Sequence, residues 1–200
     1  MSQQERKQNH MKFGLAICAW TMNAGVDDNE LFFTAINQIN KGGSDILSDP
    51  AQKVTLAALN LKAGSRAMAF SDFHSAFKLF KHGISFLSDD HWETHYNLSL
   101  DLFDSISEVA CFVDDRDSVT IYTEQLIAHA KCYDDKLNGL YAATKALKNA
   151  ERKQESLDST LEILRQLGEP GLRPFQELTG DMDAIDGILQ NTLDESIYNM

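Results

Sequence analysis

Two histidines lie four residues apart in the segment HWETH, which begins at His91, and this spacing would place both imidazoles on one face of a helix. A helical zinc-protease site has its glutamate directly after the first histidine, whereas Glu93 follows two residues later and would point to the opposite side. The segment therefore favours packing over metal binding, or over phosphorelay chemistry at His95. Trp92 and Tyr96 share a helical face, and we expect both rings to pack against the preceding helices.

Two further groups of side chains have the residue types of a calcium site and of a cysteine nucleophile with its base, but their spacing fits neither site. In GDMDAIDG, Asp181, Asp183 and Asp186 occupy the first, third and sixth places of a calcium loop. An EF-hand instead uses the first, third and fifth places and a glutamate at the twelfth, so we expect an acidic helix start or tail. His129 precedes Cys132 by three residues, but a cysteine nucleophile also needs a group that orients its base. We expect this pair to be inert.

Motifs for nucleotide chemistry are absent from the sequence. A phosphate-binding loop needs glycines followed by lysine and a helix, whereas INKGGSD (39–45) has its lysine before the glycines and no strand ahead of it. The catalytic motifs of protein kinases are also missing, and DDRDS (114–118) is typical of a helix start. The sequence thus predicts a protein that is not an enzyme, with no catalytic residue, no cofactor and no metal.

Charge limits the partners that the chain can have. The sequence has 30 acidic and 18 basic residues, and residues 101–200 hold 20 of the acidic and 9 of the basic ones. Such a surface repels phosphates and anionic lipids, so we expect neither nucleic-acid nor membrane binding and favour a basic protein or peptide. Acidity that serves only solubility is the alternative interpretation.

Three widely spaced cysteines, Cys18, Cys111 and Cys132, suit free thiols in a reducing compartment. No apolar run approaches the roughly 18 residues that span a bilayer. The first residues also lack the small-residue cleavage site of a signal peptide. These features predict a cytoplasmic protein.

Helical spacing of apolar residues dominates the chain, and no proline occurs between residues 51 and 169. The pattern predicts an all-α fold with helices at 3–22, 28–40, 50–69, 72–87, 90–113, 116–131, 134–149 and 153–167. We expect an N-terminal helix (1–27), a helical-repeat domain (28–168) and an acidic tail or linker (169–200) with short helices near 174–179 and 182–190.

Small residues at fixed intervals indicate paired helices. If Gly64 is at the eighth place of a 34-residue unit, Ala76, Phe80 and Gly83 fall at places 20, 24 and 27. Small, small, aromatic, small is the order typical of a tetratricopeptide-type pair, in which glycine permits close helix packing. The sequence therefore predicts a right-handed array of antiparallel helix pairs.

A second pair is predicted from the helices at 134–149 and 153–167, although its register residues are degenerate. Its first helix would use Leu140, Ala143, Thr144 and Leu147, and its second Ser156, Thr160 and Ile163. The pair between them, 90–113 with 116–131, has a first helix too long for the standard unit. We therefore expect degenerate repeats from which no ligand code follows.

Five blocks in order resemble one family of very large signalling proteins. They are HMKFGLAI (10–17), the stretch from LFFTAINQIN to HGISFL (31–87), HWETHYNLSLDLFDSISEVACFV (91–113), IAHAKCYDDKLNGLY (127–141) and LEILRQLGE (161–169). Those proteins run from a serine/threonine-kinase-like domain through an AAA- or STAND-type ATPase to a tetratricopeptide-like region, often followed by a GAF domain and a histidine kinase. The resemblance covers about residues 10–169 and implies the repeat region, with residues 1–27 similar to the tail of the ATPase module.

The sequence resembles the family pattern at some positions and departs from it at others. The matching positions are His10, Gly14, Leu31, Phe32, Asn40, Leu56 to Gly64, Ala67, Trp92, His95, Tyr96, Asp135 and Lys136. The departures are Phe13, Asp104, Ser105, Ser107 and the segment 114–125. The resemblance implies a scaffold that binds proteins, with the ATPase or kinase domains of related signalling proteins among its partners.

The concave face of such an array, built from its first helices, is a natural groove for a helix or peptide. We expect it to be formed by exposed polar positions on the helices at 50–69, 90–113 and 134–149. These are Asn60, Arg66, Asn97, Asp101, Asp104, Asn138 and Lys145. The alternative is a fragment of a histidine or serine/threonine kinase, or of an ATPase, that acts only when joined to its catalytic domains.

Overall fold

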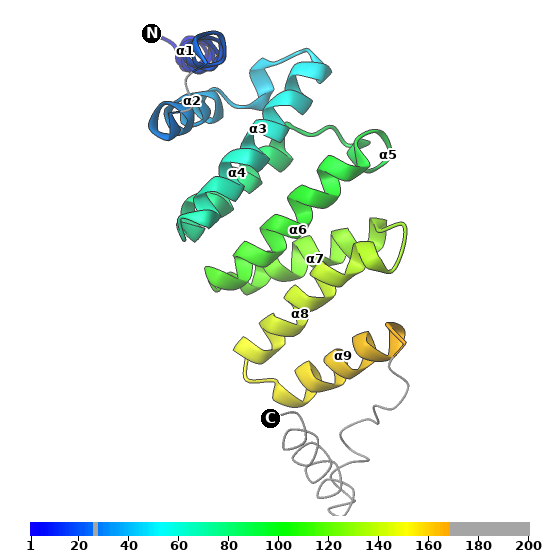
Figure 1. Ribbon diagram of the computed structural model, residues 1–200. Coiled ribbons are helices and arrows are strands. Elements are labelled where there is room, and N and C mark those ends of the chain that lie inside the picture. Colours follow the sequence, from blue (N-terminus) through cyan, green and yellow to red (C-terminus); the bar gives the residue numbers. More distant parts are fainter. Residues whose placement is uncertain (26–27, 169–200) are drawn as a thin grey trace, which may run out of the picture. The chain divides into compact units, whose positions relative to one another are not determined.

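The computed structural model describes residues 1–25 and 28–168, and every regular element within them is a helix (Figure 1). The predicted all-α fold is confirmed. The α-helices are α1 (Gln3–Ala24), α2 (Asn29–Gly42), α3 (Pro50–Ala69), α4 (Phe73–Phe86), α5 (His91–Thr94), α6 (Tyr96–Phe112), α7 (Arg116–His129), α8 (Leu137–Asn149) and α9 (Lys153–Gln166). Two short 3-10 helices, η1 (Ser44–Ile46) and η2 (Asp134–Lys136), lie in the connections. The helices expected near 174–179 and 182–190, and the acidic loop of Asp181, lie outside the described residues.

Aspartates fix the beginnings of several helices. The Asp28 carboxylate accepts hydrogen bonds from the backbone N–H groups of Glu30 and Leu31 at the start of α2. Asp49 accepts from the N–H of Ala51 just after a proline in the first turn of α3, and Asp72 caps α4. These carboxylates satisfy N–H groups that have no partner inside the helix, which is why the predicted starts agree with the observed ones within a few residues.

One predicted helix is wrong: 90–113 is not continuous but consists of α5 and α6, separated at His95. The backbone of His95 adopts φ −135° and ψ 46°, which is not helical. The buried hydroxyl of Ser99 lies at this break, with its Oγ 3.1 Å from the carbonyl oxygen of His91 and 3.0 Å from that of His95. The same two carbonyls also accept the backbone N–H groups of His95 and Ser99. No residue type in the local sequence predicts the break.

The helices α3 and α4 approach closely at two glycines. A methyl group added at Gly64 would lie 2.6 Å from Cδ1 of Phe80, and one at Gly83 would lie 3.3 Å from the Cβ of Asn60. Phe80 of α4 meets Gly64 of α3, and the later residue Gly83 of α4 meets the earlier residue Asn60 of α3. These two helices are therefore antiparallel. Gly83 also faces the next helix, since the same methyl would lie 2.7 Å from Cδ2 of Leu102 in α6. The expected role of small residues in close packing is therefore observed in this pair.

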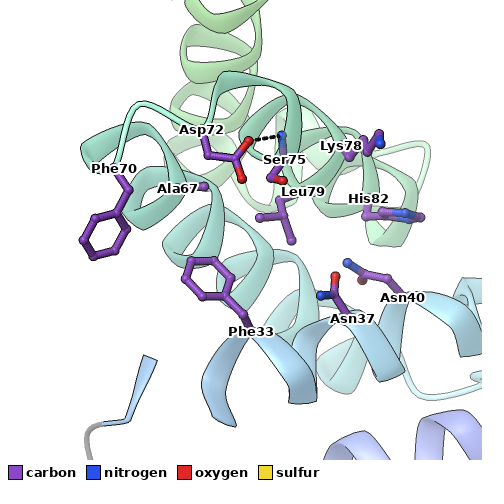
Figure 2. A pocket seen from close by; sticks show the side chains of 10 residues that line it. All are labelled: Phe33, Asn37, Asn40, Ala67, Phe70, Asp72, Ser75, Lys78, Leu79 and His82. Atoms are coloured by element: carbon purple, nitrogen blue, oxygen red, sulfur yellow. Dashed lines mark hydrogen bonds between the residues drawn. The ribbon is translucent and has the colours of Figure 1, made fainter. Parts of the chain in front are cut away.

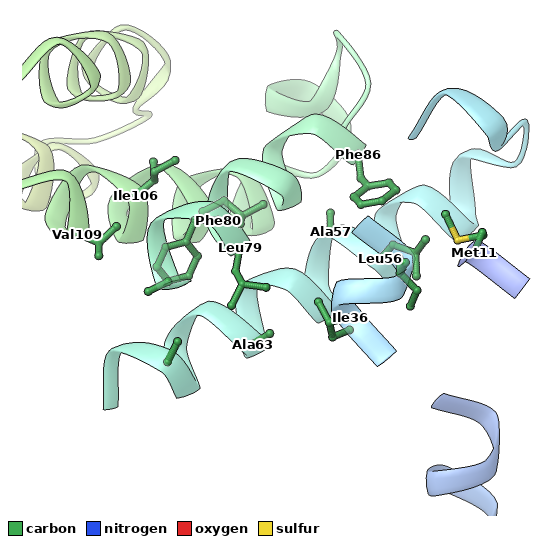
Figure 3. Close-up of a cluster of buried hydrophobic side chains, with 14 residues drawn as sticks. Met11, Ile36, Leu56, Ala57, Ala63, Leu79, Phe80, Phe86, Ile106 and Val109 are labelled. Atoms are coloured by element: carbon green, nitrogen blue, oxygen red, sulfur yellow. The ribbon is translucent and has the colours of Figure 1, made fainter. Parts of the chain in front are cut away.

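The chain divides into two compact units, residues 1–139 and 140–200, and each is described by itself. Figure 3 shows the core of the first unit, in which aliphatic and aromatic side chains from α1, α2, α3, α4 and α6 meet. Its fully buried large members include Ile36, Leu56, Phe80, Phe86, Leu102 and Ile106. Burial of each such side chain stabilises the fold by about 1.5–3 kcal/mol relative to exposure.

The second unit is described as far as residue 168, and its helix contact is partly polar. Thr144 Oγ1 lies 2.9 Å from Ser159 Oγ, and the Ser156 hydroxyl donates a 3.1 Å hydrogen bond to the carbonyl oxygen of Thr144. Ala142 and Leu161 supply buried apolar contacts. Two of these hydroxyl residues, Thr144 and Ser156, stand at positions where the predicted register expects small residues.

Candidate protein-interaction site on helix α6

Asn60 is not part of an exposed groove. Its side chain is 0% exposed, so the prediction of an exposed Asn60 is wrong. The Nδ2 of Asn40 donates a 2.8 Å hydrogen bond to Asn60 Oδ1, and Asn60 Nδ2 donates at 3.1 Å to Asn40 Oδ1 and at 3.0 Å to the carbonyl oxygen of Leu56. This reciprocal amide pair joins α2 to α3 and satisfies polar atoms that would otherwise be costly to bury.

Arg66 also joins α2 and α3. Its Nη1 donates a 2.7 Å hydrogen bond to Oδ1 of Asn29, and its guanidinium lies 4.8 Å from the centre of the Phe32 ring. The side chain is half-buried. A guanidinium held by a hydrogen bond and a ring contact is positioned as an element of helix packing.

Three of the remaining candidates follow one face of α6. Asn97 and Asp101 are exposed, and Asp104 is half-buried. Their spacing of four and three residues is that of a single helical face, which continues to Glu108. The Nδ2 of Asn138 donates a 3.0 Å hydrogen bond to Oδ2 of Asp104, so the structure brings this fourth candidate to the same surface.

Asp104 lies among the other carboxylates of this surface. Burial raises the pKa of its carboxyl above the ordinary value of 3.8, and the negative charges of Asp101, Asp135 and Glu108 raise that pKa further. The hydrogen bond from Asn138 acts in the opposite direction. The second oxygen of Asp104, Oδ1, is buried and has no hydrogen-bond partner within the described part of the chain. A carboxylate in this state is destabilised in its charged form.

Tyr96 and Asp135 meet at the end of this surface. The hydroxyl of Tyr96 donates a 2.5 Å hydrogen bond to Oδ2 of Asp135, and it accepts one of 2.9 Å from the backbone N–H of Lys131. The Lys131 Nζ lies 3.9 Å from the centre of the Tyr96 ring. We define the acidic α6 surface as Asp101, Asp104, Glu108, Asp135 and Asn138. Sequence reasoning missed Glu108 and Asp135, although Glu108 continues the helical spacing.

Trp92 packs mainly against helices that follow it, which corrects the expectation of packing on the preceding helices. Its ring centre lies 4.9 Å from that of Phe103 in α6 and 4.9 Å from that of His129 in α7, where the two rings are parallel. Among the described residues of the preceding helices, Ile84 in α4 packs against this aromatic cluster. The Nδ1 of His91 lies 2.8 Å from Ser99 Oγ, so this imidazole is part of the same packing.

The remaining candidate, Lys145, belongs to the second unit, where it is half-buried. Residues 1–25 and 28–168 contain no group of three or more His, Cys, Asp or Glu side chains placed to hold a metal ion. No helix in these ranges is long and apolar enough to cross a membrane. The three cysteines are free thiols, of which Cys111 is buried and Cys132 exposed. The arrangement on α6 can bind cationic or hydrogen-bonding groups.

A comparison with known proteins finds no matching family model, no similar curated protein and no similar solved structure.

Proposed function

We propose that the chain is a non-catalytic protein-interaction module whose acidic α6 surface binds a basic segment of another protein. In this proposal the helix pairs form a right-handed array of degenerate tetratricopeptide-like repeats, and α6 is a first helix that faces the groove. The close antiparallel packing of α3 and α4 at Gly64 and Gly83 supports such pairs. A peptide-binding groove on first helices is the common use of this architecture.

The observation that carries the proposal is the state of Asp104. Its carboxyl has a raised pKa and lies near the carboxylates of Asp101, Asp135 and Glu108. None of Asp101, Asp104 and Glu108 forms an ion pair with a residue in the described ranges. A lysine or arginine from a partner would relieve the repulsion among these carboxylates, and an arginine could donate to both oxygens of one of them.

The resemblance of the sequence to large signalling proteins is the basis for proposing where the module acts. We infer a cytoplasmic signalling context in which the partner is an ATPase or kinase domain, and the alternative is a fragment that works only when joined to such domains. The two cases differ in the coding sequence beside this chain, because only the second requires nucleotide-binding motifs there. A free module binds its partner in trans, whereas a fragment of a larger protein meets it within one polypeptide.

The test measures association rates of a partner captured from lysate and then identified and purified. The unmodified chain is compared with Asp101→Asn/Asp104→Asn over a range of salt concentrations. The matched control is Asp117→Asn/Glu124→Gln, which neutralises two exposed acids on α7. We expect the α6 variant alone to lower the association rate and its salt dependence, since screening weakens steering by charge. Equal rates for all three proteins would place the binding surface elsewhere.

A further inference from the structure

A second surface, separate from the acidic α6 surface, contains a pocket of about 380 Å³ within the first unit (Figure 2). It is formed by one face of α2, the end of α3 and one face of α4. Its lining includes Phe33, Asn37, Phe70, Lys78, Leu79 and His82. Lys78, Leu79 and His82 come from α4. His82 follows the other two by four and three residues, and this spacing places them on one helical face.

The pocket has aromatic rings at one end and amide, lysine and imidazole groups at the other. Phe33 and Phe70 lie at the aromatic end in Figure 2, where Phe70 is 66% exposed and the carboxylate of Asp72 lies beside it. Leu79, only 5% exposed, is an apolar part of the lining between the ends. Asn37, Lys78 and His82 lie at the polar end, beside the Asn40 amide held by Asn60.

Positive charge gathers at one end of this surface, in a chain whose net charge is −12. Lys78 lines the pocket, and Lys81 is close enough to the lining residue His82 to lower its pKa. Both lysines are exposed on α4, and neither forms an ion pair with a residue in the described ranges. Asp72 is the acidic residue of the lining, and it accepts a hydrogen bond from the N–H of Ser75 at the helix start.

His82 adds a polar group without a full charge. Partial burial of the exposed His82 side chain lowers its pKa from the ordinary value of 6.5, and the positive charge of Lys81 lowers it further. The imidazole is therefore neutral at pH 7 and can donate or accept one hydrogen bond toward the pocket. The titratable residues of the lining are Asp72, Lys78 and His82, and Lys81 lies near His82.

We propose that this pocket binds an acidic peptide segment of a partner protein, with one aromatic or branched aliphatic residue beside its carboxylates. The apolar side chain enters between Phe33 and Phe70, a carboxylate pairs with Lys78, and the Asn37 amide hydrogen-bonds the peptide backbone. Charge complementarity favours this occupant over a basic segment, because a basic segment would meet Lys78 and Lys81.

The test uses three fluorescein-labelled peptides with the full chain: Gly-Glu-Phe-Glu-Glu-Leu-Gly, the same peptide with lysine for each glutamate, and the same peptide with alanine for phenylalanine and leucine. Fluorescence anisotropy gives Kd, and amide chemical shifts in ¹⁵N-labelled protein locate the site. We expect the first peptide to bind most tightly and to shift the amides of Asn37, Phe70 and His82. Tighter binding of the lysine peptide, or no saturable binding of the first, would overturn the proposal.

Variants separate the pocket from general charge effects. Lys78→Glu should weaken binding of the acidic peptide about tenfold, because a charge-assisted hydrogen bond is replaced by repulsion. Lys12→Glu is the matched control on exposed α1 and should change the Kd less than about twofold. Phe70→Ala should remove the preference for the aromatic peptide over its alanine form. Sedimentation gives a further outcome: a dimer that Lys78→Glu dissociates would assign the pocket to a second copy and overturn the proposal.

Discussion

The hydroxyl of Tyr96 donates a hydrogen bond to the carboxylate of Asp135, which is 39 residues further along the chain. The bond ties the start of α6 to the connection between α7 and α8, and Lys131 of that connection covers the Tyr96 ring. The contact between Tyr96 and Asp135 holds one end of the acidic α6 surface in place.

Tyr96→Phe should lower the melting temperature at pH 7, because the Asp135 carboxylate and the Lys131 N–H both lose a partner. The hydrogen bond from Tyr96 is the main reason that the pKa of Asp135 lies below its ordinary value of 3.8. Stability from a lowered carboxyl pKa is present above the unfolded value and is lost as pH falls through the folded one. The difference between the two proteins should therefore shrink in acid. Tyr141→Phe, at an exposed tyrosine, is the control in thermal denaturation.

Gly64→Ala should destabilise the chain by about 1–3 kcal/mol, despite a gain of about 1 kcal/mol in helix propensity. The added methyl would lie 2.6 Å from Cδ1 of the fully buried Phe80, whose ring has no room to retreat. Gly64→Leu should cost more. At Gly139 the nearest atom is the flexible end of Leu126, at 2.9 Å, so Gly139→Ala should change stability little. Urea denaturation gives these free energies, and an unchanged Gly64→Leu would show that α3 and α4 are not packed as described.

Asp104→Asn should raise the melting temperature at neutral pH. Burial and three neighbouring carboxylates raise the pKa of Asp104, so its charge destabilises the folded state. A carboxyl with a raised folded pKa loses stability as pH rises through its unfolded value and then its folded one. The advantage of the variant should therefore be largest at neutral pH and disappear below about pH 4. Asp117→Asn at an exposed site serves as the control, and a pH-independent gain would contradict this cause.

Local features account for the parts of the fold that could be predicted from the sequence. Asp28, Asp49 and Asp72 satisfy N–H groups two or three residues away, and so the helix starts follow from a short window. Gly64 could be placed because its distance from Phe80 is set by one helical hairpin. These relations need no knowledge of the rest of the molecule.

The features that could not be predicted depend on partners distant in the chain. Asn60 has the polarity of a surface residue, and only Asn40, on another helix, explains its burial. The break at His95 lies beside the Ser99 hydroxyl and the aromatic packing of Trp92 on Phe103, and periodicity shows neither contact. Periodicity does place Lys78 and His82 on one helical face, but it does not show that α2 faces them to form a pocket.

The amide pair of Asn40 and Asn60 should show strong energetic coupling. Asn60→Ala leaves the half-buried Asn40 amide without its partner and opens a small cavity, and should cost about 2–3 kcal/mol. Asn40→Ala removes one of two acceptors from Asn60 Nδ2 and the donor to its Oδ1, and should cost about 1–2 kcal/mol. In the double variant neither amide remains unpaired, so its cost should be smaller than the sum by about 1 kcal/mol. Asn37→Ala, at an exposed amide in the same helix as Asn40, controls for the loss of an asparagine from α2. Additive free energies of unfolding in urea would mean that the two amides do not interact in solution.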